Sequence, residues 1–226
     1  VLLATPSGAR PAWMSQRYPE VLRVREDGLR NTHGIRHNHC FTSPTYRLKV
    51  HEINTRLAER FGKHPGVVGW HVSNEFSGCC YCDLCKNAFR DYLKREYGSL
   101  DEINRNWWTA FWSHTYTDWS QIDPPSRYGE DCVMGLNLAW QRFITYQTVD
   151  FIKNEIEPLR RLTPDLPVTT NFMNRFDDLD YSKFKDVIDF ACWDSYPLWG
   201  RDANSDAEIA LNTAFYHDYI RSILQK

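Results

Sequence analysis

The chain has 226 residues, of which 42% are hydrophobic, and this length and composition suit one large folded domain. The formal net charge is −2 and no basic block occurs, so the sequence gives no indication of a nucleic-acid partner. No apolar run reaches the roughly 18 residues that a membrane span needs.

Strands alternate with helices along the chain, which predicts an α/β fold with a parallel sheet. Short apolar runs without helical spacing indicate buried strands, and apolar residues on one face indicate helices. In chain order we expect a strand at 1–6, a long functional loop around a short strand at 14–43, a helix at 44–61, a strand at 67–75, a helix at 83–97, a short helix leading into 107–112, a helix at about 135–162, a strand at 167–173, a helix at 180–187, a strand at 188–197 and a helix at 207–226. About four or five strands are visible, whereas a closed (β/α)8 barrel has eight.

Several helix ends carry local signals. Ser43 is a plausible N-cap with Pro44 at the first helical position, and Gly62 ends that helix. Ser99 and Glu102 form a capping box by sequence. The chain opens inside a strand and stops inside a helix, so we expect it to be a piece of a longer protein.

Four of the seven cysteines lie within seven residues, at 79–85, which argues against a simple set of disulfides. Cys80, Cys82 and Cys85 supply three thiolates, and tetrahedral zinc takes four ligands. Cys40 is a better fourth ligand than Cys79, because adjacent cysteines rarely chelate one ion well and a distant ligand ties two loops together. A site closed by four protein ligands is structural.

Other interpretations of this cluster stay open. His37 or His39 could take the place of one cysteine in the ligand set. The cysteines could instead form disulfides or remain buried thiols.

Glu75 follows an apolar run at the expected carboxyl end of a strand, where parallel barrels carry their chemistry. Glycoside hydrolysis needs a carboxyl group that donates a proton to the leaving oxygen, and Glu75 suits that role if burial or a second carboxylate keeps it protonated. Asn74 beside it suits a hydrogen bond to a sugar hydroxyl. The alternative is a glutamate that merely opens a loop.

The chain resembles the family 42 glycoside hydrolases, which are β-galactosidases with a (β/α)8 TIM barrel. The resemblance covers nearly the whole chain in the order of the family. It rests on the sequence blocks 4–6 with 11–13, 36–40 with 43–46, 69–75, the three cysteines at 80, 82 and 85, 89–94, 104–113, 170–173 and 193–197. It implies that residues 1–226 form an incomplete catalytic barrel domain with about strands 2 to 6, without the first, seventh and eighth strands or later domains.

The resemblance also implies roles for single residues. Glu75 matches the general acid/base after the fourth strand and Asn74 the sugar-binding residue before it. The other matches are a sugar-contacting arginine at Arg36, an aromatic wall of the galactose subsite at Trp112, a tyrosine beside the nucleophile at Tyr196, and zinc ligands at Cys40, Cys80, Cys82 and Cys85. Cys79 is an extra cysteine, so we expect a local rearrangement of that loop.

Each substrate-binding role has a simpler alternative. Arg36 could form a surface ion pair, Trp112 could fill the core, and Tyr196 could cap a strand end. Asn171 and Asp194 lie at predicted strand ends without an assigned role. The nucleophile of the family, a glutamate after the seventh strand, falls outside the chain, and Glu208 inside a helical pattern is a poor substitute.

The resemblance therefore implies a retaining hydrolase of terminal β-D-galactosides, of which this chain carries the acid/base half and by itself is inactive. Alternatives are a non-catalytic sugar-binding barrel and a glycosidase that acts on α-L-arabinosides. Structural Zn²⁺, a homotrimeric full-length enzyme and a cytoplasmic location are further expectations, with no nucleic-acid or membrane partner.

Overall fold

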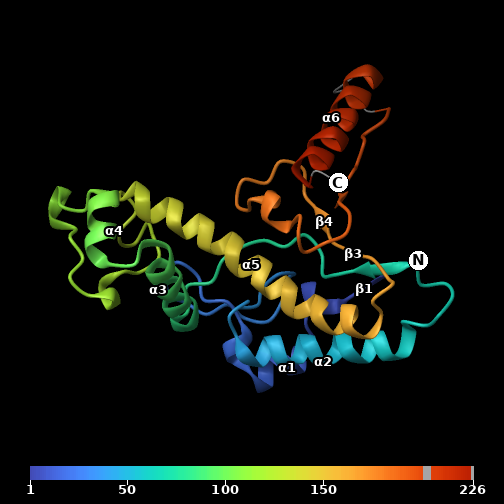
Figure 1. Cartoon of the computed structure of the whole chain (residues 1–226), viewed down its shortest axis with the longest axis horizontal. Coiled ribbons are helices and arrows are strands. Elements are labelled where there is room, and N and C mark those ends of the chain that lie inside the picture. The colour runs from blue at the N-terminus through green and yellow to red at the C-terminus, as the bar shows by residue number, and fades with distance from the viewer. Residues whose placement is uncertain (201–204, 225–226) are drawn as a thin grey trace. The chain divides into compact units, whose positions relative to one another are not determined.

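The computed structural model describes residues 1–200 and 205–224, and its elements are labelled in Figure 1. The chain divides into two compact units. The first comprises Val1–Gly8, Val50–Phe76 and Ile152–Lys226, and the second comprises Ala9–Lys49 and Ser77–Phe151. The last two residues of the helix expected at 207–226 lie outside the described residues.

The first unit holds the parallel strands. β1 (Leu2–Ala4) pairs with β2 (Gly69–His71), which pairs with β3 (Val168–Thr169). β4 (Asn171–Phe172) follows β3 after one residue and pairs with β5 (Cys192–Trp193). The strand expected at 167–173 is therefore divided at Thr170, with its first part bonded to one neighbour and its second part to another. All these pairings are parallel and follow chain order, as in a (β/α)8 barrel.

Long helices follow these strands along the chain. They are α2 (Pro44–Phe61), α5 (Met134–Leu162) and α6 (Asp206–Leu224). Inside the first unit Asn54 of α2 donates to the carbonyl oxygen of Glu155 at 3.1 Å, and His51 lies 2.7 Å from the carboxylate of Glu157, so α2 and α5 lie side by side. Gly62 ends α2 where a Cβ atom would lie 2.1 Å from Cγ2 of Thr163, which leaves room only for glycine.

The second unit is a helical lobe made of α1 (Ala12–Arg17), α3 (Asp83–Tyr97), α4 (Leu100–Trp107) and the first part of α5. Its core is aromatic: the rings of Phe89, Trp140 and Phe143 lie 5.0 to 5.3 Å apart. Ser99 accepts the backbone N–H of Glu102 at 3.2 Å, which confirms the N-cap half of the capping box predicted for α4. Short 3-10 turns complete the chain at η1 (Pro6–Gly8), η2 (Pro19–Val21), η3 (Phe111–Ser113), η4 (Trp119–Gln121) and η5 (Tyr181–Phe184).

Two expectations were wrong. The loop at 14–43 adds no strand to the sheet, because Val24 and Arg30 form only an isolated antiparallel bridge. The carbonyl oxygen of Val24 instead accepts the backbone N–H of Tyr81 at 2.9 Å, so this segment pairs with the cysteine loop. In the part of the chain that the structure describes, the strands thus occupy four neighbouring positions, within the four or five expected. The helix expected at 180–187 is the single turn η5, which Asp180 caps at Ser182.

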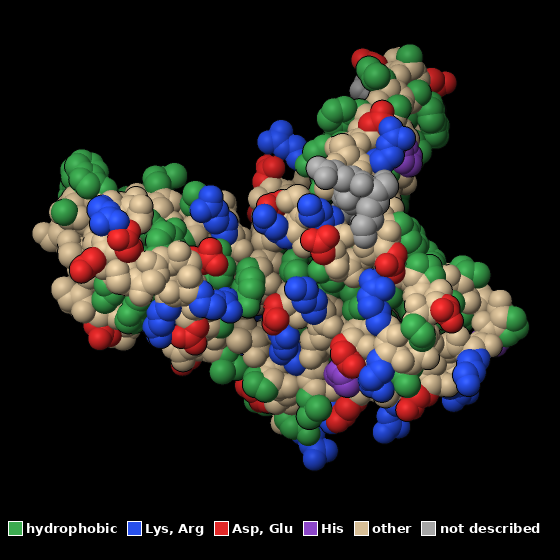
Figure 2. All heavy atoms as spheres, viewed as in Figure 1, with side chains coloured by type: hydrophobic (Ala, Val, Ile, Leu, Met, Phe, Trp, Pro, Cys, Tyr) green, Lys and Arg blue, Asp and Glu red, His purple; other side chains and the backbone are tan. Residues whose placement is uncertain are grey.

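The formal net charge of −2 is reflected in a mixed surface on the face that can be seen in Figure 2. Acidic and basic side chains are interspersed on the face shown in Figure 2. Within residues 1–200 and 205–224, every helix is too short or too polar to span a lipid bilayer.

Candidate active site and metal centre

The segment after β2 carries Glu75 in a strained backbone. The strand ends at His71, and Ser73 and Glu75 adopt φ angles of +54° and +42°, so the extended run expected to reach Glu75 stops earlier. Such left-handed conformations cost a non-glycine residue of the order of 1 kcal/mol or more. They persist because the backbone N–H of Ser73 donates to Oγ1 of Thr5 at 2.8 Å and that of Glu75 donates to Oδ1 of Asn171 at 2.9 Å.

Asn171 is the centre of this arrangement. Its side chain is buried at the start of β4. Its Nδ2 donates to both carboxylate oxygens of Asp194 at 2.8 and 2.9 Å and lies 3.2 Å from Oδ1 of Asn74. One amide therefore links the carboxyl ends of β2, β4 and β5 around Glu75. The sequence placed Asn171 and Asp194 at strand ends, and that position was the signal that could have assigned them to the site.

Glu75 and Asp194 form a carboxyl pair. Burial raises the pKa of Asp194, and a hydrogen bond with the carboxyl group of Glu75 raises it further, against the opposing effect of Asn171. The contact with a second carboxyl group thus keeps Asp194 protonated to a higher pH than an isolated aspartate.

A second carboxyl group lies beneath the segment after β2. Glu155 of α5 is fully buried, and burial raises its pKa to about 8, partly offset by hydrogen bonds from Ser7 and Thr5. Oγ1 of Thr5 lies 3.4 Å from Oε2 of Glu155 while it accepts the N–H of Ser73. A neutral buried acid thus supports the hydroxyl group that holds the strained backbone.

The remaining predicted sugar-binding residues lie on the surface. Tyr196 is 78% exposed and lines a groove of about 290 Å³ between the segment after β5 and α6, in the first unit. Trp112 is 76% exposed, which excludes the core alternative for it, and Arg36 is exposed as well. Trp112 and Arg36 belong to the second unit.

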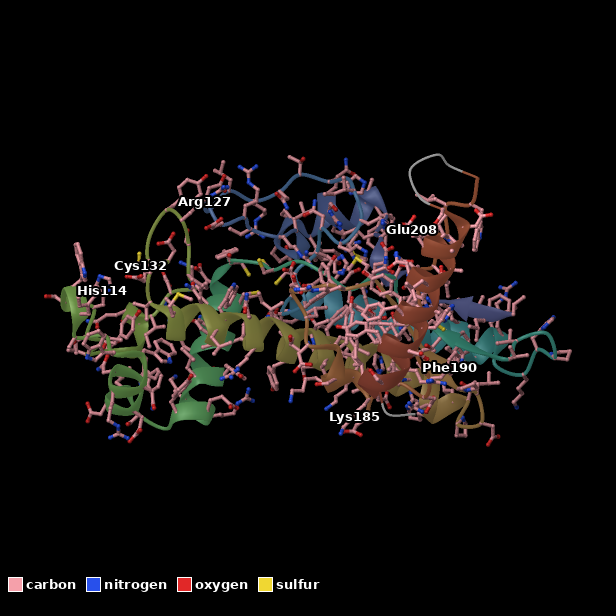
Figure 3. All side chains as sticks on the ribbon, turned by 90° about the horizontal axis from the view of Figure 1, so that it is seen from above. His114, Arg127, Cys132, Lys185, Phe190 and Glu208 are labelled. Carbon is pink, nitrogen blue, oxygen red and sulfur yellow. The ribbon has the colours of Figure 1, made fainter. Side chains whose placement is uncertain are left out.

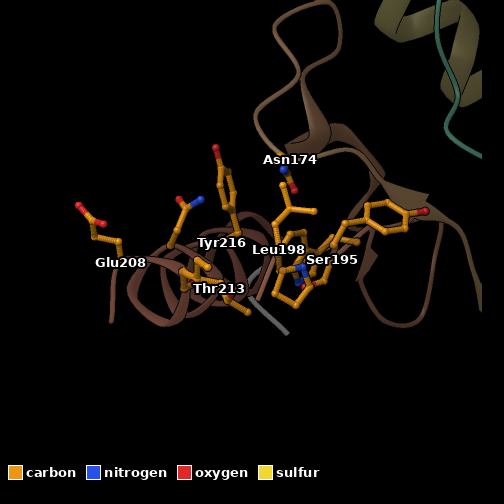
Figure 4. Close-up of a pocket in the computed structure, with 11 residues that line it drawn as sticks. Asn174, Ser195, Leu198, Glu208, Thr213 and Tyr216 are labelled. Atoms are coloured by element: carbon orange, nitrogen blue, oxygen red, sulfur yellow. Dashed lines mark hydrogen bonds between the residues drawn. The ribbon is translucent and has the colours of Figure 1, made fainter. Parts of the chain in front are cut away.

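Glu208 serves as a helix cap. Its carboxylate accepts the backbone N–H and the hydroxyl group of Ser205 at 2.8 and 2.9 Å, and Ser205 in turn accepts the N–H of Glu208 at 3.3 Å. Figure 4 shows Glu208 at the end of the groove away from Ser195. These hydrogen bonds lower the pKa of Glu208 and assign it to the start of α6.

Four cysteines meet in the second unit. The Sγ atoms of Cys40, Cys80, Cys82 and Cys85 all lie within 4.8 Å of one another and are buried. Sγ of Cys40 is 3.7 Å from that of Cys82 and 3.4 Å from that of Cys85. Four thiolates about 2.3 Å from a tetrahedral ion are about 3.8 Å apart, so the set fits zinc.

The geometry excludes the disulfide alternative for this cluster. A disulfide has its sulfur atoms about 2.05 Å apart, and none of the seven cysteines forms one. Cys79 stays outside the group of four. Cys132, labelled in Figure 3, is exposed and its thiol donates to Asp131.

Comparison with known proteins agrees with this geometry. The sequence profile of the Glyco_hydro_42 family, described as β-galactosidase, matches residues 1–226. The chain is 61% identical over 226 residues to the β-galactosidase BglY of Alicyclobacillus acidocaldarius and 54% identical over 233 residues to the β-galactosidase GanA of Bacillus subtilis. These matches cover 100% of this chain but 33% and 35% of those proteins. The chain thus spans about a third of the length of the curated relatives that it matches.

Solved structures give the same result. The chain is similar, with a TM-score of 0.95 and 56% identity, to the cold-adapted β-galactosidase from Rahnella sp. R3 and to a catalytic mutant of Gan42B, a GH42 β-galactosidase from G. stearothermophilus. The matches cover 100% and 99% of this chain and 33% and 34% of those chains. The expected fold class, a (β/α)8 barrel covered in part, is confirmed.

Proposed function

The chain belongs to glycoside hydrolase family 42, the β-galactosidases, and we propose that the enzyme containing it removes terminal β-D-galactosyl groups by a retaining double displacement. The observation that carries this proposal is the carboxyl group of Glu75, paired with Asp194 at the carboxyl ends of the parallel strands. In barrel enzymes this end holds the chemistry.

Glu75 is the proposed general acid/base. It protonates the glycosidic oxygen as the bond breaks and then takes a proton from the water that hydrolyses the galactosyl–enzyme ester. The carboxylate that attacks the anomeric carbon is assigned to a part of the enzyme outside this sequence. Retention requires about 5–5.5 Å between the two carboxyl groups. The Asp194 carboxyl group and the Asn171 amide position Glu75.

The other assigned residues bind the sugar. Asn74 is proposed to hydrogen-bond a sugar hydroxyl group, a bond that strengthens in the transition state. Arg36 is proposed to contact the galactosyl group, and Trp112 to stack on it. Tyr196 is proposed to lie beside the attacking carboxylate. The exposure of Trp112 and Tyr196 supports these roles, because both side chains are available to a ligand.

The cysteine cluster is proposed to hold structural zinc. Cys40, Cys80, Cys82 and Cys85 use all four positions of a tetrahedral ion, which leaves none for a reacting water. Bound zinc would supply a crosslink between the segment at Cys40 and the segment that leads into α3. The homotrimer and the cytoplasmic location remain predictions from family resemblance.

Hydrolysis by the full-length enzyme tests the proposed activity. Among nitrophenyl glycosides we expect the β-D-galactoside to have the highest kcat/KM, and proton NMR to show the β-anomer of galactose as the first product. A higher kcat/KM for the α-L-arabinoside would contradict the galactoside assignment. The α-anomer as the first product would exclude the double displacement. No hydrolysis of any glycoside by a folded enzyme would support the non-catalytic alternative.

A further inference from the structure

Arg23 is a buried cation next to the cysteine cluster. Its side chain is 8% exposed, and its guanidinium group is directed into the protein by two backbone carbonyl groups. Nε donates to the carbonyl oxygen of His39 at 2.8 Å, and Nη2 donates to that of Ser77 at 2.7 Å. The group also lies over the ring of Phe41, 5.1 Å from its centroid. These contacts fix the orientation of the guanidinium group, but they are neutral and do not balance its charge.

Buried arginines are almost always paired with an opposite charge, since burial of an isolated charge is costly. Across residues 1–200 and 205–224, no aspartate or glutamate forms an ion pair with Arg23. The acidic groups that act on it are thiols: that of Cys79, which has the largest effect, and those of Cys80, Cys40 and Cys85 in the cluster. The cluster thus supplies three of these four thiols.

The chain around Arg23 is built against the same cluster. The backbone N–H of the next residue, Val24, donates to Sγ of Cys80 at 3.3 Å. The carbonyl oxygen of Val21 accepts the N–H of Cys40 at 2.8 Å. The segment 21–24 thus contacts both halves of the ligand set.

Gly78 makes room for the guanidinium group. A Cβ atom on Gly78 would lie 2.1 Å from Nη1 of Arg23, and the residue adopts a φ of +74°. Both the space and the backbone conformation therefore require glycine at this position. Gly78 lies between Ser77, whose carbonyl group Arg23 binds, and Cys79, in the segment that follows Glu75 in the sequence.

We propose that Arg23 is the buried counter-ion of the metal–thiolate centre and that it fastens the segment 77–79, just after Glu75, to that centre. The charge balance of the centre explains why a counter-ion is needed. A divalent ion with four thiolates has a net charge of −2, and one buried guanidinium group halves that charge. The inference rests on the proposed zinc site and does not depend on the proposed galactosidase activity.

Two variants of the full-length enzyme separate charge from shape. R23K keeps the positive charge, and R23Q keeps a hydrogen-bond donor without the charge. The readout is the zinc dissociation constant, measured by competition with a chromophoric chelator. We expect R23Q to bind zinc about 10- to 100-fold more weakly, the usual effect of losing an outer partner of a metal site, and R23K to lie close to the wild type. R25Q removes a neighbouring arginine that is paired with Asp27 and should change nothing.

A change in the ligand set tests the same charge balance. C82H replaces a thiolate with a neutral imidazole, so the net charge of the centre changes from −2 to −1. R23Q should then cost clearly less zinc affinity in the C82H background than in the wild type, and the absorption bands of Co²⁺ report whether the ion is still bound tetrahedrally. Equal losses in R23K and R23Q, or an R23Q penalty that C82H leaves unchanged, would overturn the counter-ion role. Absence of zinc from the wild-type enzyme would overturn the metal assignment itself.

Discussion

At the residue scale, the environment of Glu75 is set by neighbours that are distant in sequence. Asn171 comes 96 residues later and accepts its N–H. The groups that face the Asp194 carboxyl are Glu75, Asn171, His71 and Tyr181. Burial and the hydrogen bond with Glu75 raise the pKa of Asp194, so this carboxyl group holds its proton more tightly than an isolated aspartate.

The substitution D194N removes this acidic group and keeps the shape of the side chain. We expect kcat/KM for a galactoside with a poor leaving group to fall, and the alkaline limb of its pH profile to move to lower pH, because the carboxyl group with the raised pKa is gone. The profile between pH 4 and pH 9 is the measurement. D177N, at an exposed carboxylate paired with Arg175, is the control. An unchanged alkaline limb in D194N would show that Asp194 does not act through Glu75.

The residues of the site also differ in how well they could be predicted from the sequence. Three cysteines within six residues predict a metal site from spacing alone, and the structure brings Cys40 to them. No local pattern marks the link from Asn171 to Asp194, because both acquire their partners only when the parallel strands align. The positive φ of Ser73 and Glu75 was equally hidden, because neither residue type favours that conformation.

At the scale of elements, α5 supports the segment that carries Glu75. Glu155 lies on this helix beneath β1, and its hydrogen-bond partner Thr5 holds the backbone of Ser73. Because the folded state keeps Glu155 protonated up to about pH 8, the stability of the enzyme must depend on pH in this range.

The sign of this dependence follows from proton binding. In the unfolded chain Glu155 loses its proton near its ordinary pKa of 4.5, whereas the folded state retains it to about 8. The folded state therefore holds one more proton between these values, and the free energy of unfolding falls by about 1.4 kcal/mol per pH unit as pH rises, until the folded state also ionises. E155Q should flatten this decline when thermal unfolding is followed from pH 5 to pH 8.

E157Q is the matched control for that substitution. Glu157 lies on the same helix, is accessible to solvent and pairs with His51 and Arg161. The substitution E157Q should therefore leave the decline in the free energy of unfolding toward pH 8 unchanged. An equally steep decline in E155Q and the wild type would contradict the assignment of a buried neutral acid.

Element boundaries show where local sequence was sufficient. The limits of α2, α3 and α5 agree closely with those expected, because each has an apolar face or a terminal signal such as Ser43 or Gly98. α1 was not predicted, and the helix expected at 180–187 is only the single turn η5, since both elements are too short for a periodic pattern. The division of the strand at Thr170 depends on which neighbours its two halves meet, and that is a property of the sheet.

At the scale of the whole molecule, the proposed zinc crosslinks segments that are far apart in the sequence. Its binding energy becomes folding energy, because the unfolded chain does not offer a preformed site. Removal of the metal should therefore lower the midpoint of thermal unfolding. Hydrogen exchange should become faster in residues 21–24, 40–43 and 77–85, where the backbone contacts the ligand cysteines.

Cysteine variants separate this effect from general damage. C85S removes a buried ligand and should reproduce the effect of metal removal on thermal unfolding and exchange. C132S removes an exposed thiol outside the cluster and should change neither thermal unfolding nor exchange. A zinc-containing enzyme whose stability is the same after metal removal would contradict the structural role of the ion.

The most direct test of the account is the substitution E75A in the full-length enzyme. We expect kcat/KM for a galactoside with a poor leaving group to fall by at least about 100-fold, because general acid catalysis is lost. On a nitrophenyl β-galactoside, azide should restore turnover and yield β-galactosyl azide, since the small anion attacks the galactosyl–enzyme from the face that Glu75 vacates. Wild-type activity in E75A, or no response to azide, would contradict the assignment of Glu75 as the acid/base.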